Sequence, residues 1–285
     1  MINRLRTVLL FVPADRPDFF PKAAASTADT LIFDLEDAVA RGNKENSRSL
    51  LERALMENTF GSKELAVRIN ALASPWGRDD LAMVSSSKAI HLIIIPKAEP
   101  DDVRLTDQLL GENGPDMICL IETALGLQRA YDTVCASKRI VGIMLGAEDL
   151  SAEMNLRRTN SGKEINFARH SLALSAYAAG IQPIDTPYLQ VDDLEGLRLD
   201  TMQSRDIGFT AKAALSPKQV PVIRNVFRPD PAEIEKARRI MKAADEALNS
   251  GRGVITLDGE MIDAPVVARA RQLLELAREA ENDDR

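Results

Sequence analysis

Eight short apolar runs, each followed by a segment of helical periodicity, constrain the fold of this chain more than any other feature. Apolar runs without polar alternation are typical of strands buried on both faces, as in a parallel sheet. We expect strands at Thr7–Val12, Thr30–Phe33, Leu65–Ile69, Ile90–Ile95, Met117–Ile121, Ile140–Leu145, Gly180–Ile184 and Gly208–Ala211.

The segments between these runs have apolar residues at helical spacing. The clearest examples are Pro17–Ser26, Lys44–Met56, Asp101–Leu110, Asn166–Ala179 and Asp192–Ser204. Eight strands that alternate with helices predict an α/β fold, a closed (β/α)₈ TIM barrel, rather than an open doubly wound sheet. No strand is followed by a glycine-rich dinucleotide fingerprint or by a P-loop, which disfavours the nucleotide-binding folds. The 285 residues suffice for one barrel and an extension.

The last part of the chain has a different pattern. We expect a catalytic barrel over residues 1–225 and a C-terminal helical and hairpin extension over residues 226–285. Asp230–Asn249 and Val266–Glu281 read as charged amphipathic helices. Turn residues in Gly251–Gly259 surround the short apolar run Val254–Leu257. Because closing the barrel does not need this extension, we expect it to pack on a neighbouring subunit or to cover the site.

Composition disfavours several classes of function. The formal net charge is −7 and the chain has no Lys/Arg-rich run, so we expect no nucleic-acid partner. The apolar run within Met1–Leu10 is too short to span a membrane and no cleavage site follows it, which predicts a cytoplasmic protein. Cys119 and Cys135 lack metal or redox spacing, and we expect both to be reduced core residues.

The chain has only two histidines, His91 and His170, and both lie in segments where a structural role is the simpler interpretation. Most zinc sites and most serine or cysteine relays require imidazole. The chemistry must therefore come from carboxylates, arginine, lysine and a hard cation.

A charged residue stands near the end of every predicted strand, and active sites of barrels gather where the strands end. We therefore expect all of these charges on one rim. In chain order they are Asp15 and Arg16, Asp34 with Glu36 and Asp37, Arg68, Lys97, Glu122, Glu148 and Asp149, Asp185, and Lys212.

Glu122 and Asp149 follow neighbouring strands, so both carboxylates can reach one point. Two carboxylates completed by water and substrate oxygens suit Mg²⁺, which keeps much of its hydration. Arg68 can hold a carboxylate or an enolate oxygen in a bidentate manner. We expect one or two of the acids at 34, 36 and 37 to accept hydrogen bonds from Arg68 or Lys97.

A lysine at the end of a barrel strand can also form a Schiff base, and Lys97 and Lys212 are the candidates. Lys97 lies beside Glu99 on a rim dominated by acids, which favours ion pairing or substrate anchoring instead.

The strand ends also carry a family resemblance. The segments Leu10–Pro17, Asp34–Val39, Arg68–Asn70, Pro96–Glu99, Ile121–Ala124, Gly146–Leu150 and Gly259–Pro265 resemble the citrate lyase β-subunit-like family of the HpcH/HpaI aldolase superfamily. The resemblance extends over about residues 6–275, with the motifs in the family's order. It departs from the family at Ala14, Ser216 and Val266, where Gly, His and His are common.

The resemblance implies a (β/α)₈ barrel that binds Mg²⁺ through Glu122 and Asp149, with Arg68 on the substrate. It implies cleavage or formation of a citryl-, malyl- or citramalyl-type thioester of coenzyme A or of an acyl-carrier protein, with an acetyl thioester and a keto acid as the other partners. Asp263 resembles a family aspartate that reaches an adjacent subunit, which implies a homotrimer or a hexamer.

From these features we predict a Mg²⁺-dependent carbon–carbon lyase that passes through an enolate. Its catalytic residues are predicted to be Arg68, Asp37 and Asp263, with Arg16, Glu36, Lys97 and Glu122 also binding substrate. Two alternatives stay open, namely a malyl-CoA-type thioesterase on the same site and a non-catalytic or carrier-dependent subunit of a lyase complex.

Overall fold

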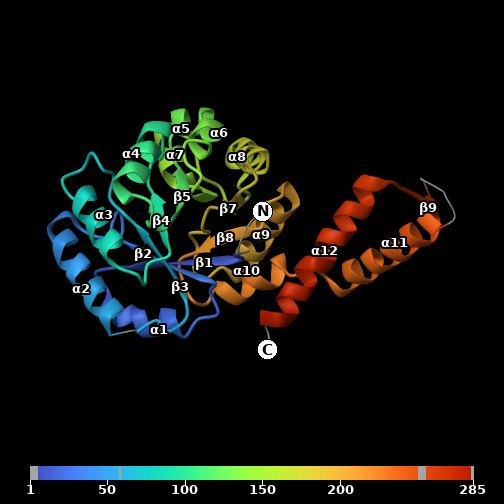
Figure 1. Cartoon of the computed structure of the whole chain (residues 1–285), viewed down its shortest axis with the longest axis horizontal. Coiled ribbons are helices and arrows are strands. Elements are labelled where there is room, and N and C mark those ends of the chain that lie inside the picture. Colours follow the sequence, from blue (N-terminus) through green and yellow to red (C-terminus); the bar gives the residue numbers. More distant parts are fainter. Residues whose placement is uncertain (1–5, 58, 250–254, 284–285) are drawn as a thin grey trace. The chain divides into compact units, whose positions relative to one another are not determined.

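The computed structural model describes residues 6–57, 59–249 and 255–283, which form two compact units, one ending at Arg224 and one beginning at Asn225. The first unit is a closed barrel of eight parallel strands in sequence order, with helices outside it (Figure 1). Val8 of the first strand pairs with Lys212 of the eighth, which closes the barrel. The predicted fold is confirmed.

The strands are β1 (Val8–Pro13), β2 (Thr30–Asp34), β3 (Glu64–Arg68), β4 (Leu92–Ile95), β5 (Asp116–Ile121), β6 (Ile140–Leu145), β7 (Gln182–Asp185) and β8 (Ala211–Ala214). The first seven begin and end within two residues of their predicted bounds. The prediction of Gly208–Ala211 for the eighth was wrong. Gly208 has a φ of 109° and ends the preceding helix in a left-handed conformation, so the strand begins three residues later.

Ten α-helices of the described chain are α1 (Phe20–Ala24), α2 (Lys44–Met56), α3 (Gly77–Ser86), α4 (Pro100–Leu110), α5 (Ala124–Gln128), α6 (Ala130–Val134), α7 (Ala147–Glu153), α8 (Asn166–Ala179), α9 (Leu194–Ile207) and α10 (Val220–Phe227). The 3₁₀ turns are η1 (Pro17–Phe19), η2 (Arg41–Asn43) and η3 (Lys163–Ile165). The predicted bounds of α2 and α8 are confirmed. The predicted helix Pro17–Ser26 begins instead with η1 and ends two residues early.

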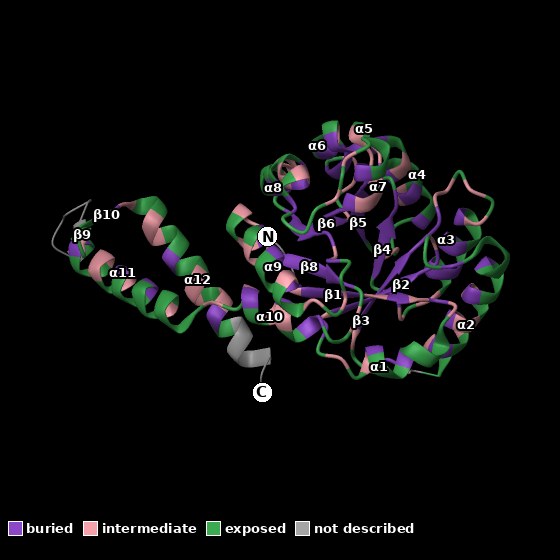
Figure 2. Ribbon diagram, turned by 180° about the vertical axis from the view of Figure 1, so that it is seen from behind, coloured by how far each residue is buried: buried purple, intermediate pink, exposed green. Residues whose placement is uncertain are grey.

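Alternation along the strands decides which side chains enter the barrel, since successive residues point to opposite faces. The buried interior cluster contains Leu9, Ile32, Ala66, Leu92, Ile94, Ile118, Leu120, Met144, Ile184, Ala211 and Ala213. Two residues beyond Ile32, Ala66 and Leu120, the same inward phase reaches Asp34, Arg68 and Glu122. The strands are buried nearly throughout, while the outer faces of the helices are exposed (Figure 2).

The second unit consists of α11 (Pro231–Asn249), a hairpin of β9 (Ile255–Leu257) and β10 (Glu260–Ile262), and α12 (Ala264–Asp283). Its small core contains Ala237, Ile240, Ile262 and Ala270. The hairpin turn uses Asp258 and Gly259, both at positive φ (53° and 83°), as a tight two-residue turn demands. The predicted turn residues Gly251–Gly253 and Val254 lie outside the described residues.

Two predictions about composition can be compared with the fold. Cys119 is buried in β5, whereas Cys135 is exposed beyond the end of α6, so the prediction of a core position for Cys135 was wrong. The helix presents that residue to solvent because Thr133 and Val134 occupy its inner face. No helix among the described residues is long and apolar enough to cross a membrane. Arg4 and the rest of residues 1–5 lie outside the described part of the chain.

Candidate active site

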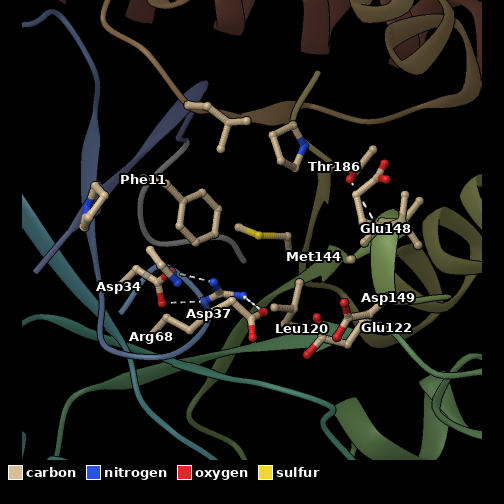
Figure 3. Close-up of a pocket in the computed structure, with 17 residues that line it drawn as sticks. Phe11, Asp34, Asp37, Arg68, Leu120, Glu122, Met144, Glu148, Asp149 and Thr186 are labelled. Atoms are coloured by element: carbon tan, nitrogen blue, oxygen red, sulfur yellow. Dashed lines mark hydrogen bonds and ion pairs between the residues drawn. The ribbon is translucent and has the colours of Figure 1, made fainter. Parts of the chain in front are cut away.

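A cavity of about 470 Å³ opens at the carboxyl end of the barrel (Figure 3). It is lined by inward-facing residues at the strand ends and by the loops that follow. They are Phe11, Pro13, Asp34, Asp37, Ala38, Arg68, Leu120, Glu122, Met144, Leu145, Gly146, Ala147, Glu148, Asp149, Thr186, Pro187 and Leu215. Charged groups occupy two sides of the cavity, and apolar side chains fill the space between them.

Arg68 forms one charged side. Its Nε and Nη2 donate to the two carboxylate oxygens of Asp34 at 2.8 and 2.6 Å. Its Nη1 lies 3.3 Å from Asp37 and 3.1 Å from Glu36, and the guanidinium also lies over Phe11. Burial alone would lower the pKa of Arg68, but the hydrogen bond and charge of Asp34 outweigh it and raise this pKa. The guanidinium is therefore fixed, charged and aimed at the cavity.

Glu122 forms the opposite side with Asp149. Its Oε1 accepts the backbone N–H of Lys97 at 2.8 Å. A Cβ on Gly146 would lie 2.5 Å from the Cβ of Glu122 and 2.8 Å from its Oε2, so only glycine leaves room for this side chain. Burial, followed by the negative charge of Glu36, raises the pKa of Glu122 to about 8. Burial likewise raises the pKa of Glu36 to about 7.

The Lys97 side chain lies between the acids. Its Nζ donates to Asp149 Oδ2 at 2.8 Å and lies 3.9 Å from Glu122 Oε1 and 3.7 Å from Glu36 Oε1. Lys97 has a φ of 47°, a left-handed conformation that is uncommon for a residue other than glycine. Burial would lower the pKa of Lys97, but the hydrogen bond to Asp149 and the charge of Glu122 raise it. The predicted ion pairing of this lysine is therefore present, and the uncharged amine required for a Schiff base is disfavoured.

The residues present fit a magnesium ion. A lysine ammonium lies within 4 Å of a carboxylate oxygen of both Glu122 and Asp149, so one point between them already attracts a cation. The described residues contain no group of three or more His, Cys, Asp or Glu side chains arranged to hold a metal. Two carboxylates completed by oxygens of water and substrate are the arrangement that Mg²⁺ accepts.

The other predicted site residues have different surroundings. Arg16 is exposed, pairs with Asp18 at 2.8 Å, lies over Phe19 and does not line the cavity. Asp263 belongs to the second unit, where its Oδ1 accepts the N–H of Val266 at 3.2 Å at the start of α12. Its predicted catalytic role stays a prediction.

The expectation that every strand end supplies a charge to the rim was wrong for β7 and β8. Asp185 and Lys212 lie in the outward phase, between the strands and the helices. Lys212 donates to Asp185 at 2.5 Å and to the carbonyl of Thr186 at 2.7 Å. Arg169 of α8 and Asp200 of α9 complete a buried cluster of two cations and two anions. Lys212 is therefore enclosed away from the cavity.

Several cavity residues were not identified from the sequence as functional. Phe11, Leu120, Met144 and Leu215 provide an apolar wall, and Thr186 accepts the N–H of Ala147 at 3.3 Å. Inward phase was the available signal, because Leu120 and Met144 belong to the interior cluster and Phe11 stands two residues after its member Leu9. Its use requires the register of the strands, which an apolar run alone does not specify.

A parallel eight-stranded barrel with a fixed guanidinium opposite a cation-attracting carboxylate pair defines a class of protein suited to stabilising negative charge on an oxygen-rich substrate. Residues 7–217 match the family described as HpcH/HpaI aldolase/citrate lyase. The chain belongs to this family.

The chain is similar over most of its length to proteins of two kinds, citrate lyase β subunits and malyl-CoA thioesterases. It is 36% identical to the citrate lyase subunit beta of Leuconostoc mesenteroides subsp. cremoris, over 96% of this chain and 94% of the relative. It is 35% identical to a (3S)-malyl-CoA thioesterase of Cereibacter sphaeroides, over 93% and 92%. Among solved structures, CitE from Mycobacterium tuberculosis in complex with magnesium, acetoacetate and coenzyme A has a TM-score of 0.82 and 32% identity, covering 96% and 98%.

Proposed function

We propose that this protein is a Mg²⁺-dependent carbon–carbon lyase that converts a 3-hydroxyacyl thioester into an acetyl thioester and a keto acid, or catalyses the reverse reaction. Citramalyl, malyl and citryl thioesters of coenzyme A or of a carrier protein are the candidate substrates. The structure of CitE from Mycobacterium tuberculosis in complex with magnesium, acetoacetate and coenzyme A supports a site that takes a metal ion, a keto acid and a coenzyme A thioester. We expect the enzyme to work in the cytoplasm.

One observation carries this proposal. Arg68 and the Glu122–Asp149 pair face the same cavity from opposite sides, and the wall between them is apolar. Breaking the bond between C2 and C3 of the thioester leaves an electron pair that becomes a thioester enolate. Fixed positive groups in a site of low dielectric stabilise such an oxyanion without reorganisation.

The residues divide the work as follows in this proposal. Glu122 and Asp149 would hold the magnesium ion, which acts as a Lewis acid on oxygens of the keto-acid half. Arg68, locked by Asp34, donates to the developing enolate oxygen. Asp37 lines the cavity beside Arg68 and takes the proton of the 3-hydroxyl group as the new carbonyl forms.

The enolate carbon then needs a proton to become the methyl group of the acetyl thioester. We assign this step to Asp263 of an adjacent subunit in a homotrimer or hexamer, with residues 226–285 as the extension that brings it there. Lys97, Glu36 and Arg16 are assigned to substrate binding, with Lys97 and Arg16 on its anionic groups. The role of Asp263 rests on the resemblance to the family, and those of Glu36 and Lys97 rest on their positions beside Arg68 and Glu122. The role of Arg16 rests on the sequence alone, because Arg16 does not line the cavity.

The proposal is tested with Glu122→Gln and with removal of divalent cations by a chelator, using citramalyl-CoA, malyl-CoA and citryl-CoA as substrates. We expect each treatment to lower keto-acid formation at least 100-fold, as the loss of a main electrostatic contact does. Glu164→Gln is a matched control, because Glu164 pairs with Arg158 at 2.6 Å and does not line the cavity. Undiminished keto-acid formation after both treatments would contradict the metal assignment.

The similarity to (3S)-malyl-CoA thioesterases favours a second candidate, hydrolysis of the thioester at the same site. The products distinguish the two reactions, since a thioesterase releases a free dicarboxylic acid and coenzyme A, whereas a lyase releases a keto acid and acetyl-CoA. The third candidate, a carrier-dependent subunit of a lyase complex, predicts no turnover of free coenzyme A thioesters by the purified chain. The similarity to citrate lyase β subunits favours testing it with an acyl-carrier protein.

A further inference from the structure

The ammonium of Lys97 is placed where a second cation would compete with it. It donates to Asp149 at 2.8 Å and lies 3.9 Å from Glu122, the two carboxylates assigned to magnesium. Like charges repel at such distances, and one carboxylate oxygen cannot keep a close ammonium while it binds a divalent ion. Because Lys97 Nζ contacts Asp149 Oδ2 and Glu122 Oε1, an ion bound through these two oxygens displaces the Lys97 side chain.

The structure also provides a second position for the displaced side chain. The Glu36 Oε1 already lies 3.7 Å from Lys97 Nζ. The Glu36 Oε2 is buried, and although Arg68 lies 3.1 Å from it, it accepts no hydrogen bond from the described residues. A small rotation of the lysine therefore exchanges Asp149 for a carboxylate that still has hydrogen-bonding capacity.

The backbone of Lys97 can stay fixed during this exchange. Its N–H donates to Glu122 Oε1 at 2.8 Å, a contact of the main chain that does not depend on the side-chain rotamer. The same residue thus orients one proposed metal ligand with its main chain and neutralises the other with its side chain. About 45% of the Lys97 side chain is exposed, so the ammonium has room to move.

We propose that Lys97 is an internal counter-cation that occupies the space between Glu122 and Asp149 in the metal-free protein and moves to Glu36 when a divalent ion binds. This inference rests on the metal site of the proposed function. Its consequence is that the lysine weakens divalent-ion affinity while it keeps the two acids in position.

The test measures Mn²⁺ affinity by electron paramagnetic resonance of the free ion, with Mg²⁺ as the competitor, so no turnover is needed. Lys97→Met removes the charge but keeps the length and the backbone N–H, and we expect it to bind Mn²⁺ about fivefold more tightly, equivalent to about 1 kcal/mol. Lys97→Gln should tighten binding similarly, and Lys97→Arg should not. Lys218→Met is the remote control, because that exposed lysine pairs only with Asp192 among the contacts described for it.

The outcomes separate this inference from the proposed function. If the wild type binds Mn²⁺ and Glu122→Gln abolishes binding, the metal site stands. Equal or weaker affinity in folded Lys97→Met and Lys97→Gln proteins would then overturn the counter-cation role alone. If the wild type and every variant fail to bind Mn²⁺, the metal site of the proposed function is overturned together with it. A metal-bound crystal structure with Lys97 still on Asp149 would also contradict the exchange.

Discussion

Two clusters of charged residues at the barrel differ in how their charges are balanced. Outside strands β7 and β8, Arg169 and Lys212 face Asp185 and Asp200, and the two charges of each sign are fully or nearly fully buried. At the mouth, two cations face five acids, which are Asp34, Glu36, Asp37, Glu122 and Asp149. The first cluster is complete, whereas the second has an excess of negative charge.

The difference separates a structural role from a functional one. A buried group of paired charges fixes a local geometry. Here Lys212 fixes the carbonyl of Thr186 at the cavity wall, although the buried Nη1 of Arg169 has no hydrogen-bond partner among the described residues. An excess of buried acid is costly, as the raised pKa values of Glu36 and Glu122 show. Such a site lowers its free energy when a cation binds, and perturbed carboxyl groups in a cavity are typical of functional sites.

The largest expected effect is on the balanced cluster. Lys212→Met leaves two buried aspartates with one arginine, and we expect it to lower the free energy of unfolding by about 3–5 kcal/mol, measured by urea denaturation. The double variant Lys212→Met/Asp200→Asn restores one charge of each sign and should recover part of this loss. A single variant as stable as the wild type would show that the cluster is not the structural element described above.

At the mouth of the barrel, we expect a substitution to change the free energy of catalysis rather than that of unfolding, and by a smaller amount. Arg68→Lys keeps the charge but loses the bidentate contact with Asp34, and we expect kcat/KM for the cleaved thioester to fall about 100- to 1000-fold. Arg48→Lys is the matched control, because Arg48 pairs with Asp79 and Asp80 and does not line the cavity. Comparable losses in both variants would point to a general effect of arginine replacement.

The smallest effect concerns pH. Burial raises the pKa of Glu122 from its ordinary 4.5 to about 8, so between these values the folded metal-free protein holds more protons than the unfolded chain. Its stability must then fall as pH rises from about 5 to about 8, by about 1 kcal/mol or more. Glu122→Gln should flatten this part of the curve, and saturating Mg²⁺ should do the same. An unfolding free energy that rises with pH in this window would contradict the assignment.

The sequence predicted the barrel well, because continuous apolar runs depend on burial that the closed sheet supplies on both faces. It also predicted that Arg68, Glu122 and Asp149 would line one cavity. It failed for Lys212 because β8 begins at Ala211, so this residue lies within the strand rather than beyond its end. There it faces the helix layer, between the inward-facing Ala211 and Ala213. The position of the Lys97 ammonium depends on a left-handed backbone that no spacing rule predicts.

The lack of a side chain at Gly146 helps in interpreting the sequences of related proteins. Because a methyl group at this position would collide with both the Cβ and an oxygen of Glu122, the glutamate and the glycine have to be retained together. A related sequence that keeps the glutamate but carries a larger residue at the equivalent of Gly146 must shift the backbone there, and with it the carboxylate, because rotation of the side chain cannot relieve a contact with Cβ. The identity of one residue without a side chain thus serves as a marker for sorting relatives into those that keep the ion-binding geometry and those that have lost it.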